Sequence, residues 1–289
     1  MKKIHFTYLL ILAMFLWGGG WSALKVLTYE LPMDVIVFWR FFVMSISFIP
    51  ILYFMKEPLH LNSAGAKFVV SSSVLNIAFM VSSFLGIKVG LATDAGVIIT
   101  TLAPIMTFLL IAIIFKTKFN TSQYLGLFIG LAGGIIMLEL DDINLFLNGS
   151  NIYFLLCAII WAGITLLSQH SQRHVNPIHY SFYISVVATL ASFLYALDSN
   201  LSVVFSQGMV FWIALIYLAV LGQTVATTIF FIASGKLGSE KTSSFMFLVP
   251  LFSLIIAWAI LGENAQLHVV TGGIMSLVAV YFINKKYSN

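Results

Sequence analysis

Ten apolar stretches, each about as long as a bilayer is thick, follow one another along the chain with short polar breaks between them. An α-helix rises about 1.5 Å per residue, so roughly 20 apolar residues cross the hydrocarbon core. A chain of 289 residues that is 61% hydrophobic and 8% charged has more apolar surface than a water-soluble core can hide. The sequence therefore predicts an all-α polytopic membrane protein with ten transmembrane helices, near residues 6–28, 33–54, 66–87, 93–115, 121–139, 151–170, 177–197, 208–234, 239–261 and 265–284.

The basic residues favour one side of this predicted topology. With a cytoplasmic N-terminus, 11 of the 14 Lys and Arg residues fall in cytoplasmic segments, and eight of the ten acids fall on or near the other side. Lys and Arg accumulate in the short cytoplasmic loops of membrane proteins. We therefore expect both termini to be cytoplasmic. Because the basic residues are scattered along the chain rather than clustered, we expect no nucleic-acid partner.

The two halves of the chain resemble each other. A shift of 146 residues places Pro104 on Pro250 and Gly126 on Gly272, and a shift of 144 places Trp17 on Trp161. We expect one repeat over residues 1–143 and a second over residues 144–289. Each repeat holds five helices, so the second enters the membrane from the opposite side and the repeats are inverted. Inverted repeats are typical of secondary transporters, because exchanging the conformations of the halves exchanges the side on which the site opens.

Several segments are similar to the EamA domain of the drug/metabolite transporter superfamily. In the first half these are residues 15–25 (FLWGGGWSALK), 38–41 (FWRF), 85–88 (LGIK) and 102–104 (LAP). In the second half they run from Ala233 through residues 247–250 (FLVP) to residues 261–263 (LGE). The first copy departs from the Gly-Glu ending, since it carries Lys116-Thr117 there. The resemblance covers almost the whole chain as two copies of the domain.

This resemblance implies a ten-helix carrier that moves a small metabolite across a bacterial inner membrane, by export or exchange, with an amino acid as the leading solute. Organic cations, drugs, nucleosides and sugar-like metabolites are the alternative solutes of the same fold, and a membrane scaffold is a further alternative. No nucleophile elbow or H-E-x-x-H pair is present, so we do not expect an enzyme or a cofactor. The expected partners are a small solute and the lipid bilayer, in a monomer or a homodimer.

Arg40 is a charged residue that lies inside a predicted span, about two helical turns from its outer end. Charged groups inside a membrane are costly and commonly face a wet cavity. One interpretation is an anchor for a solute carboxylate, which favours zwitterions or anions over cations. The other is structural: an ion pair with Asp94 or Glu139, or snorkelling of the guanidinium to the outer interface.

Further residues are candidates for lining a central cavity. Amide side chains offer both donors and acceptors and suit a zwitterion or a hydroxylated solute, although they equally join helices to one another. Deep aromatic rings suit stacking against a solute, although packing explains many of them. With two hydroxyl residues close before the membrane prolines, the predicted solute contacts are Trp17, Trp21, Arg40, Asn76, Thr100, Trp161, Tyr183, Gln223 and Ser244.

Glycine and proline residues predict where helices bend. The run Gly18-Gly19-Gly20 weakens the first helix in mid-span. Pro104 and Pro250 each remove one backbone hydrogen bond and leave a carbonyl for a neighbour or a solute. We interpret these five residues as hinge or structural positions. The spacing Gly126-x3-Gly130-x3-Gly134 predicts close packing against another helix of the chain or a second protomer.

No Asp or Glu lies near the centre of a predicted span, so a carboxylate proton relay is not evident. Asp94 and Glu139, near the outer ends of their helices, are the fallback positions for proton coupling. Facilitated uniport or exchange is therefore at least as well supported as proton antiport. His170 and His174 stand one turn apart without a third ligand, which does not make a metal site.

Overall fold

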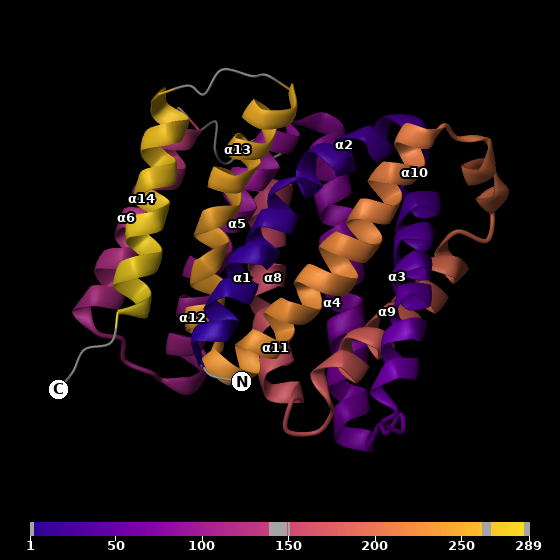
Figure 1. The fold of residues 1–289 in the computed structure, drawn as a ribbon, viewed down its shortest axis with the longest axis horizontal. Coiled ribbons are helices and arrows are strands. Elements are labelled where there is room, and N and C mark those ends of the chain that lie inside the picture. Colours follow the sequence, from indigo (N-terminus) through magenta and orange to yellow (C-terminus); the bar gives the residue numbers. More distant parts are fainter. Residues whose placement is uncertain (1–2, 139–148, 150, 262–266, 286–289) are drawn as a thin grey trace.

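The fold is a bundle of helices, described here from a computed structural model that covers residues 3–138, 149, 151–261 and 267–285 (Figure 1). Within these residues the secondary structure is helical and contains no strand. In this described part of the chain, nine helical spans are long and apolar enough to cross a membrane, and Thr121–Met137 is a shorter apolar helix. The predicted ten-helix membrane fold is therefore confirmed. The predicted repeat boundary at residues 143 and 144 lies outside the described residues.

The elements follow the predicted spans closely. Three of the spans, the first, eighth and ninth, are each divided into more than one helical element.

Asn side chains cap several helices: Asn62 accepts from the Gly65 amide, and Asn120 forms a capping box with Gln123. The first half contains α1 (Lys3–Gly18), α2 (Gly20–Glu30), α3 (Met33–Met55), α4 (Ser63–Val89), α5 (Ala92–Phe115) and α6 (Thr121–Met137). The second half contains α8 (Asn151–Ser171), α9 (Pro177–Tyr195), η1 (Leu201–Ser206), α10 (Met209–Ile216), η2 (Tyr217–Thr227), α11 (Thr228–Leu237), α12 (Ser239–Ser244), η3 (Phe245–Leu248), α13 (Val249–Leu261) and α14 (Leu267–Asn284).

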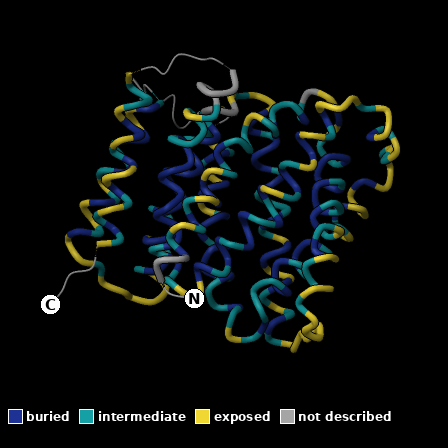
Figure 2. The backbone as a smooth tube through the Cα atoms, in the orientation of Figure 1, coloured by how far each residue is buried: buried dark blue, intermediate teal, exposed yellow. Residues whose placement is uncertain are grey.

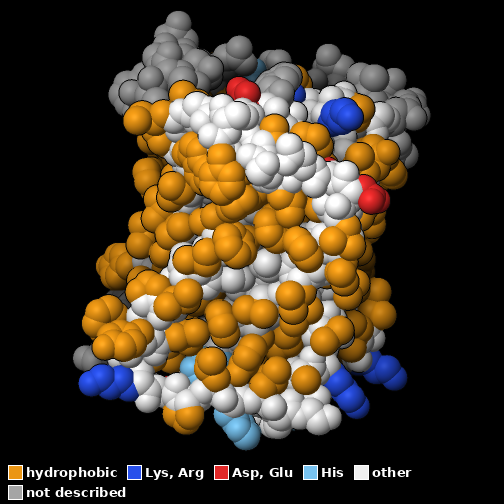
Figure 3. Space-filling model, turned by 90° about the vertical axis from the view of Figure 1, so that its right-hand side faces the viewer, with side chains coloured by type: hydrophobic (Ala, Val, Ile, Leu, Met, Phe, Trp, Pro, Cys, Tyr) orange, Lys and Arg blue, Asp and Glu red, His pale blue; other side chains and the backbone are white. Residues whose placement is uncertain are grey.

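The surface of the bundle is apolar around its middle. Figure 3 shows a broad band of hydrophobic side chains, with most of the visible Lys and Arg at the lower end and the visible acids at the upper end. Large hydrophobic side chains such as Phe54 and Leu190 are exposed, and buried residues concentrate on inward faces (Figure 2). A surface of this kind suits a lipid environment. The beginning of α1 and the end of α14 lie at the same, lower end of the bundle (Figure 1).

Equivalent helices of the two repeats pack against each other or exchange partners. The second helix of each repeat meets its counterpart as α3 against α9, and the fifth helices meet as α6 against α14. The third span of the first repeat, α4, packs against α8, the first span of the second repeat; in the mirrored contact, η2 and α11 pack against α1. The fourth span behaves in the same way, since α5 packs against α8 and α13 packs against α1. This exchange of partners is the pattern that two inverted repeats require.

Gly126 and Gly133 of α6 pack against α14 of the same chain, whereas a Cβ atom added at Gly130 would meet Phe247 of η3 and one added at Gly134 would meet Thr101 of α5. A Cβ atom added at Gly126 would lie 2.9 Å from the carbonyl oxygen of Ala279, and one added at Gly133 would lie 3.0 Å from that of Gly272. The 146-residue shift converts one contact into the other, since it carries 126 to 272 and 133 to 279. The absence of side chains lets the two backbones approach closely, as in other membrane helix pairs.

The two repeats differ at three equivalent places. The first span is interrupted at Gly19, between α1 and α2, whereas its counterpart α8 is continuous through Gly163. The third span of the second repeat contains the π-helix η2, whereas α4 is a regular α-helix. Before Pro250 the chain forms the 3-10 segment η3, whereas α5 continues through Pro104. The same fold therefore holds two conformations of each of these three spans.

Candidate solute-binding cavity

A cavity of about 100 Å³ lies where the broken first span, the π-helix and the 3-10 segment meet. Its eighteen lining residues come from α1, α2, α3, α4, α5, α8, η2 and η3, and thus from both repeats. A single water needs at least about 10–15 Å³ in such a cavity, so this volume has room for several waters or a small solute.

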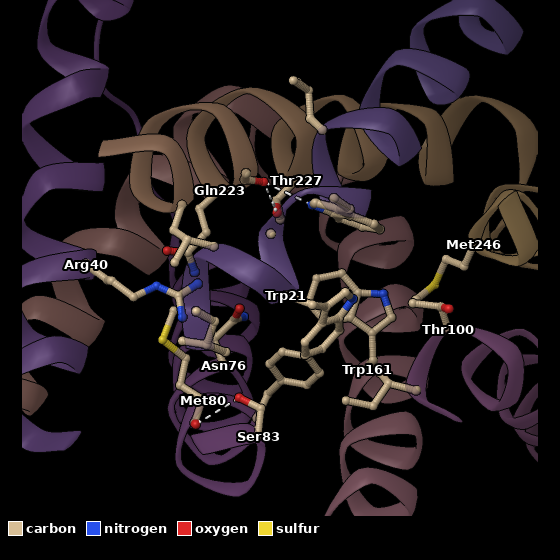
Figure 4. A pocket seen from close by; sticks show the side chains of 18 residues that line it. Trp21, Arg40, Asn76, Met80, Ser83, Thr100, Trp161, Gln223, Thr227 and Met246 are labelled. Atoms are coloured by element: carbon tan, nitrogen blue, oxygen red, sulfur yellow. Dashed lines mark hydrogen bonds between the residues drawn. The ribbon is translucent and has the colours of Figure 1, made fainter. Parts of the chain in front are cut away.

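Seven of the predicted solute contacts line this cavity together: Trp17, Trp21, Arg40, Asn76, Thr100, Trp161 and Gln223. In Figure 4 the polar side chains of Arg40, Gln223 and Asn76 lie at one end, and Thr100 and Met246 lie at the other. The rings of Trp21 and Trp161 lie between the two ends. The cavity thus has a cationic, amide-lined end and an aromatic body.

Arg40 brings the positive charge into the cavity. Its helix, α3, begins directly after Pro32, and the neighbouring Trp39 turns away to donate to the carbonyl of Leu201 at 3.0 Å. Arg40 itself is 9% exposed. Within the described residues its guanidinium forms no ion pair or hydrogen bond, and its Nε is buried without an acceptor. Neither an ion pair with Asp94 nor snorkelling therefore describes Arg40 here, and Glu139 lies outside the described residues.

Gln223 enters the cavity from the π-helix η2. The hydroxyls of Thr224 and Thr227 donate to carbonyls five residues earlier, those of Ala219 and Gly222, each at 3.1 Å. π-Helical turns are rare and concentrate at functional sites. The Gln223 Oε1 atom is buried without a donor.

Asn76 belongs to the matching span of the first repeat, and α4 is regular there. Its Nδ2 donates to the carbonyl of Ser72 at 2.8 Å, one turn earlier. Asn76 is therefore oriented by its own helix.

Trp17 and Trp161 form the centre of an aromatic cluster in the cavity wall. Their rings meet edge to face, with centroids 5.2 Å apart and planes at 86°. Trp17 also packs against Phe230 at 5.1 Å, and Trp161 packs against Phe79 at 5.0 Å. The Nε1 atom of Trp17 donates to the carbonyl of Gly222 at 3.0 Å, but that of Trp161 is buried without an acceptor.

Each residue of the glycine run meets a different neighbour. A Cβ atom at Gly18 would lie 2.9 Å from the backbone nitrogen of Ser253 in α13. One at Gly19 would lie 2.6 Å from the hydroxyl of Tyr217, which donates to the carbonyl of Leu16. Gly20 lines the cavity, and a Cβ there would meet only Leu218, at 3.5 Å.

The two prolines are buried, and each leaves the carbonyl of a cavity-lining residue without its usual helical donor. Pro104 has no N–H for the carbonyl of Thr100, and Pro250 has none for that of Met246. Both Thr100 and Met246 line the cavity. The 3-10 turn supplies Met246 with another donor, the Val249 amide.

Two of the predicted solute contacts, Tyr183 and Ser244, do not line the cavity. Tyr183 packs against the apolar core beside Phe182. Ser244 donates to the carbonyl of Lys241 and accepts from Nδ2 of Asn284 in α14. Thr100 lies four residues before its proline, and the residue four before Pro250 is Met246, which is the one that reaches the cavity.

The predicted coupling carboxylates are not among the lining residues. Asp94 lies in the first turn of α5, and Glu139 lies outside the described residues. No acidic side chain belongs to the described lining of the cavity. In the described part of the chain, no group of three His, Cys, Asp or Glu residues could hold a metal ion.

Several lining residues were missed by the sequence interpretation, although a helical pattern points to them. Phe79, Met80 and Ser83 follow Asn76 by three, four and seven residues and share its face of α4. Thr227 follows Gln223 by four. A search along the helical face of each predicted contact therefore recovers these four residues.

Comparisons with known proteins agree with the fold. The model of the EamA-like transporter family matches the chain twice, over residues 6–139 and 149–285. An "uncharacterized transporter" of Archaeoglobus fulgidus is 25% identical over 99% of this chain and 98% of its own length. A "probable amino-acid metabolite efflux pump" of Salmonella typhimurium is 22% identical over 95% of this chain and 93% of its own length. A solved crystal structure shares the fold with a TM-score of 0.76 at 15% identity, over 98% of this chain and 97% of that one.

The family match covers both halves of the chain, and the relatives named above are transporters that align along almost their whole length. The chain is a multi-pass membrane protein whose inverted repeats enclose a cavity of solute size. It therefore belongs to the EamA-like transporter family, within the drug/metabolite transporter superfamily, and is a transporter of a small molecule rather than an enzyme.

Proposed function

We propose that this transporter moves a small zwitterion, foremost an amino acid, across a bacterial inner membrane by alternating access through the central cavity. The observation that carries the proposal is Arg40, whose guanidinium lines the cavity with no counter-charge among the described residues. A buried, unpaired cation costs several kcal/mol. A solute carboxylate at Arg40 would offset that cost.

The amide of Gln223 supports a zwitterion over a simple anion. Its Oε1 is a buried acceptor without a donor, in the same cavity as Arg40. A solute ammonium group supplies such a donor. The Salmonella relative named for amino-acid metabolite efflux agrees with this solute class. Organic cations fit less well, because Arg40 repels them and no carboxylate belongs to the described lining.

The differences between the repeats support alternating access. In a carrier with inverted repeats, the opposite state arises when each half adopts the conformation of the other. The interrupted first span, the π-helix and the 3-10 turn each have an unbroken counterpart in the other repeat. We infer that these three pairs exchange conformations during transport, with Gly163 and Pro104 as the bending points of the second state.

We also propose that both termini are cytoplasmic and that the solute gradient drives transport. The end of the bundle where α1 begins and α14 ends also carries most of the visible Lys and Arg side chains (Figure 3). Uniport or exchange fits a cavity whose described lining has no carboxylate, and proton coupling would fall to Asp94 or Glu139. The protomer count, one or two, does not enter this mechanism, since the cavity is built within one chain.

Counterflow in proteoliposomes tests this function. The vesicles are preloaded with the twenty amino acids, and labelled ones are added individually, with and without a pH gradient. We expect uptake of one chemical subset by the wild-type protein, and loss of that uptake in Arg40→Gln. No counterflow of any amino acid by folded, inserted protein would remove amino acids from the proposal, and a pH-gradient effect would point to Asp94 or Glu139.

A further inference from the structure

Three polar atoms of the cavity lining are buried without a partner among the described residues: the Nε of Arg40, the Oε1 of Gln223 and the Nε1 of Trp161. The proposed function uses the first two, for the carboxylate and the ammonium group of a zwitterion. It leaves the indole N–H of Trp161 unexplained. Trp161 is 7% exposed, so water does not reach this donor freely.

The fold does not force this N–H to be unpaired, because its repeat counterpart has a partner. Trp17 donates to the carbonyl of Gly222, which lies within the π-helix η2. The 146-residue shift carries position 222 to Asn76, which lies within the regular helix α4. In a regular helix that carbonyl accepts from an amide one turn later. Among the described residues, Trp161 packs against Phe79 of α4 but donates to no carbonyl of that helix.

The position of Trp161 sets it apart from the charged end of the cavity. Figure 4 shows Arg40 at one end and the ring of Trp161 beyond Trp21, toward Thr100. A solute whose carboxylate lies at Arg40 and whose length fills the cavity would bring its other end to Trp161. An indole N–H is a donor only, so the complementary solute group is an acceptor.

We infer that the solute carries a side-chain hydrogen-bond acceptor, a hydroxyl or an amide carbonyl, that binds Nε1 of Trp161. The transporter then selects small polar amino acids over apolar ones of the same shape. This inference rests on the proposed function and adds Trp161 as the residue that determines specificity. A solute without the acceptor leaves the buried N–H unpaired, and such mismatches are strongly discriminated in sites built to hydrogen-bond their ligand.

Pairs of amino acids with matching shapes test the inference. Serine is compared with 2-aminobutyrate, threonine with valine, and asparagine with leucine, each as the labelled solute in counterflow. We expect the wild-type protein to favour the acceptor-bearing member of at least one pair by roughly tenfold or more in initial rate. Equal rates within every transported pair, or a preference for the apolar members, would overturn the inference and leave the proposed function standing. No counterflow of any of the six solutes or of the pooled amino acids would instead contradict the proposed function.

Trp161→Phe removes the donor and keeps an aromatic ring. We expect the preference within the pair to fall to about twofold or less, because the polar member is lost while the apolar member is still carried. Trp212→Phe is the matched control, since Trp212 lies in an aromatic cluster of α10 outside the cavity lining, and it should keep the wild-type preference. An equal loss for both members of a pair would assign the N–H to the conformational cycle and contradict a role in specificity.

A second variant covers the case in which Trp161→Phe does not fold. Replacement of Trp161 by 3-benzothienylalanine keeps the bicyclic shape and substitutes sulfur for N–H. This variant should lose the preference as Trp161→Phe does. If it keeps the full preference, the N–H does not bind the solute.

Discussion

Trp17 and Trp161 meet edge to face with ring centroids 5.2 Å apart, although 144 residues separate them in the chain. Each comes from the first span of its repeat, so the contact joins the two halves at the cavity wall. The two rings differ in their hydrogen bonding, since only Trp17 has a partner for its N–H among the described residues. The carbonyl that Trp17 reaches belongs to the π-helix η2, whereas Trp161 packs against the regular helix α4, so the difference accompanies a difference in local helix conformation.

Trp17→Phe should destabilise the protein by about 1 kcal/mol, because it removes the hydrogen bond to the Gly222 carbonyl. Thermal unfolding in detergent measures the effect, with Trp212→Phe as a control that loses an indole outside the cavity. The carbonyl of Gly222 keeps its bond from Thr227, so the loss should not be larger. No difference between the two variants would argue against a structural role for the Trp17 bond.

Arg40→Gln should raise the melting temperature of the solute-free protein while abolishing transport of a carboxylate solute. The guanidinium is buried without a counter-charge, and removing an unpaired buried charge relieves its desolvation cost. For a protein of this size, 1 kcal/mol corresponds to roughly 2–4 °C. If Arg40 had a purely structural role, Arg40→Gln would lower the melting temperature. A lowered melting temperature would therefore contradict the role of Arg40 as a solute anchor.

Gly18→Ala and Gly20→Ala form a matched pair with different outcomes. At Gly18 the new methyl group meets the backbone of α13 at 2.9 Å, and such overpacking typically costs about 1–3 kcal/mol. At Gly20 it has room, but it takes space in the cavity. We expect Gly18→Ala to lower the melting temperature, and Gly20→Ala to keep it and slow transport of the larger solutes. Equal melting temperatures would contradict the close approach of α1 and α13.

Gly163→Ala tests the exchange of conformations between the repeats. Alanine favours a helix over glycine by about 1 kcal/mol, and in α8 its methyl group would meet only a methyl of Leu75, at 3.3 Å. If α8 bends at Gly163 in the opposite state, this substitution stabilises the present state. We expect solute binding to persist and counterflow to slow several-fold. Unchanged counterflow would show that α8 does not bend at this residue.

The sequence was sufficient for the helices and for much of the cavity, because both depend on strong energetic constraints. Apolar length decides which segments span, and a charge as costly as Arg40 has few places to lie. The alignment of Trp17 with Trp161 predicted equivalent positions, and the two rings touch. Pro104 and Pro250 also aligned, and the residues four positions before each of them line the cavity.

The differences between the predicted solute contacts and the observed cavity lining come from local helix geometry that side-chain patterns do not encode. An α-helix, a 3-10 helix and a π-helix differ in residues per turn, so a change of type rotates the following side chains to another face. The 3-10 turn of η3 presents Met246 to the cavity, and Ser244 bonds Asn284 instead. The π-helix of η2 likewise has no signature in its sequence, although it provides the carbonyl for Trp17. The residue type and depth of Tyr183 suit a solute contact, but they do not fix the face of α9 that it occupies.

The central claim is that Arg40 binds a solute carboxylate in the cavity, and counterflow of an amino acid against its carboxamide tests it most directly. The carboxamide keeps the size and the ammonium group and lacks only the negative charge. The proposed mechanism predicts that the wild-type protein exchanges the amino acid and not the carboxamide, and that Arg40→Gln no longer exchanges the amino acid. Exchange of the carboxamide by the wild-type protein at the rate of the amino acid would contradict it.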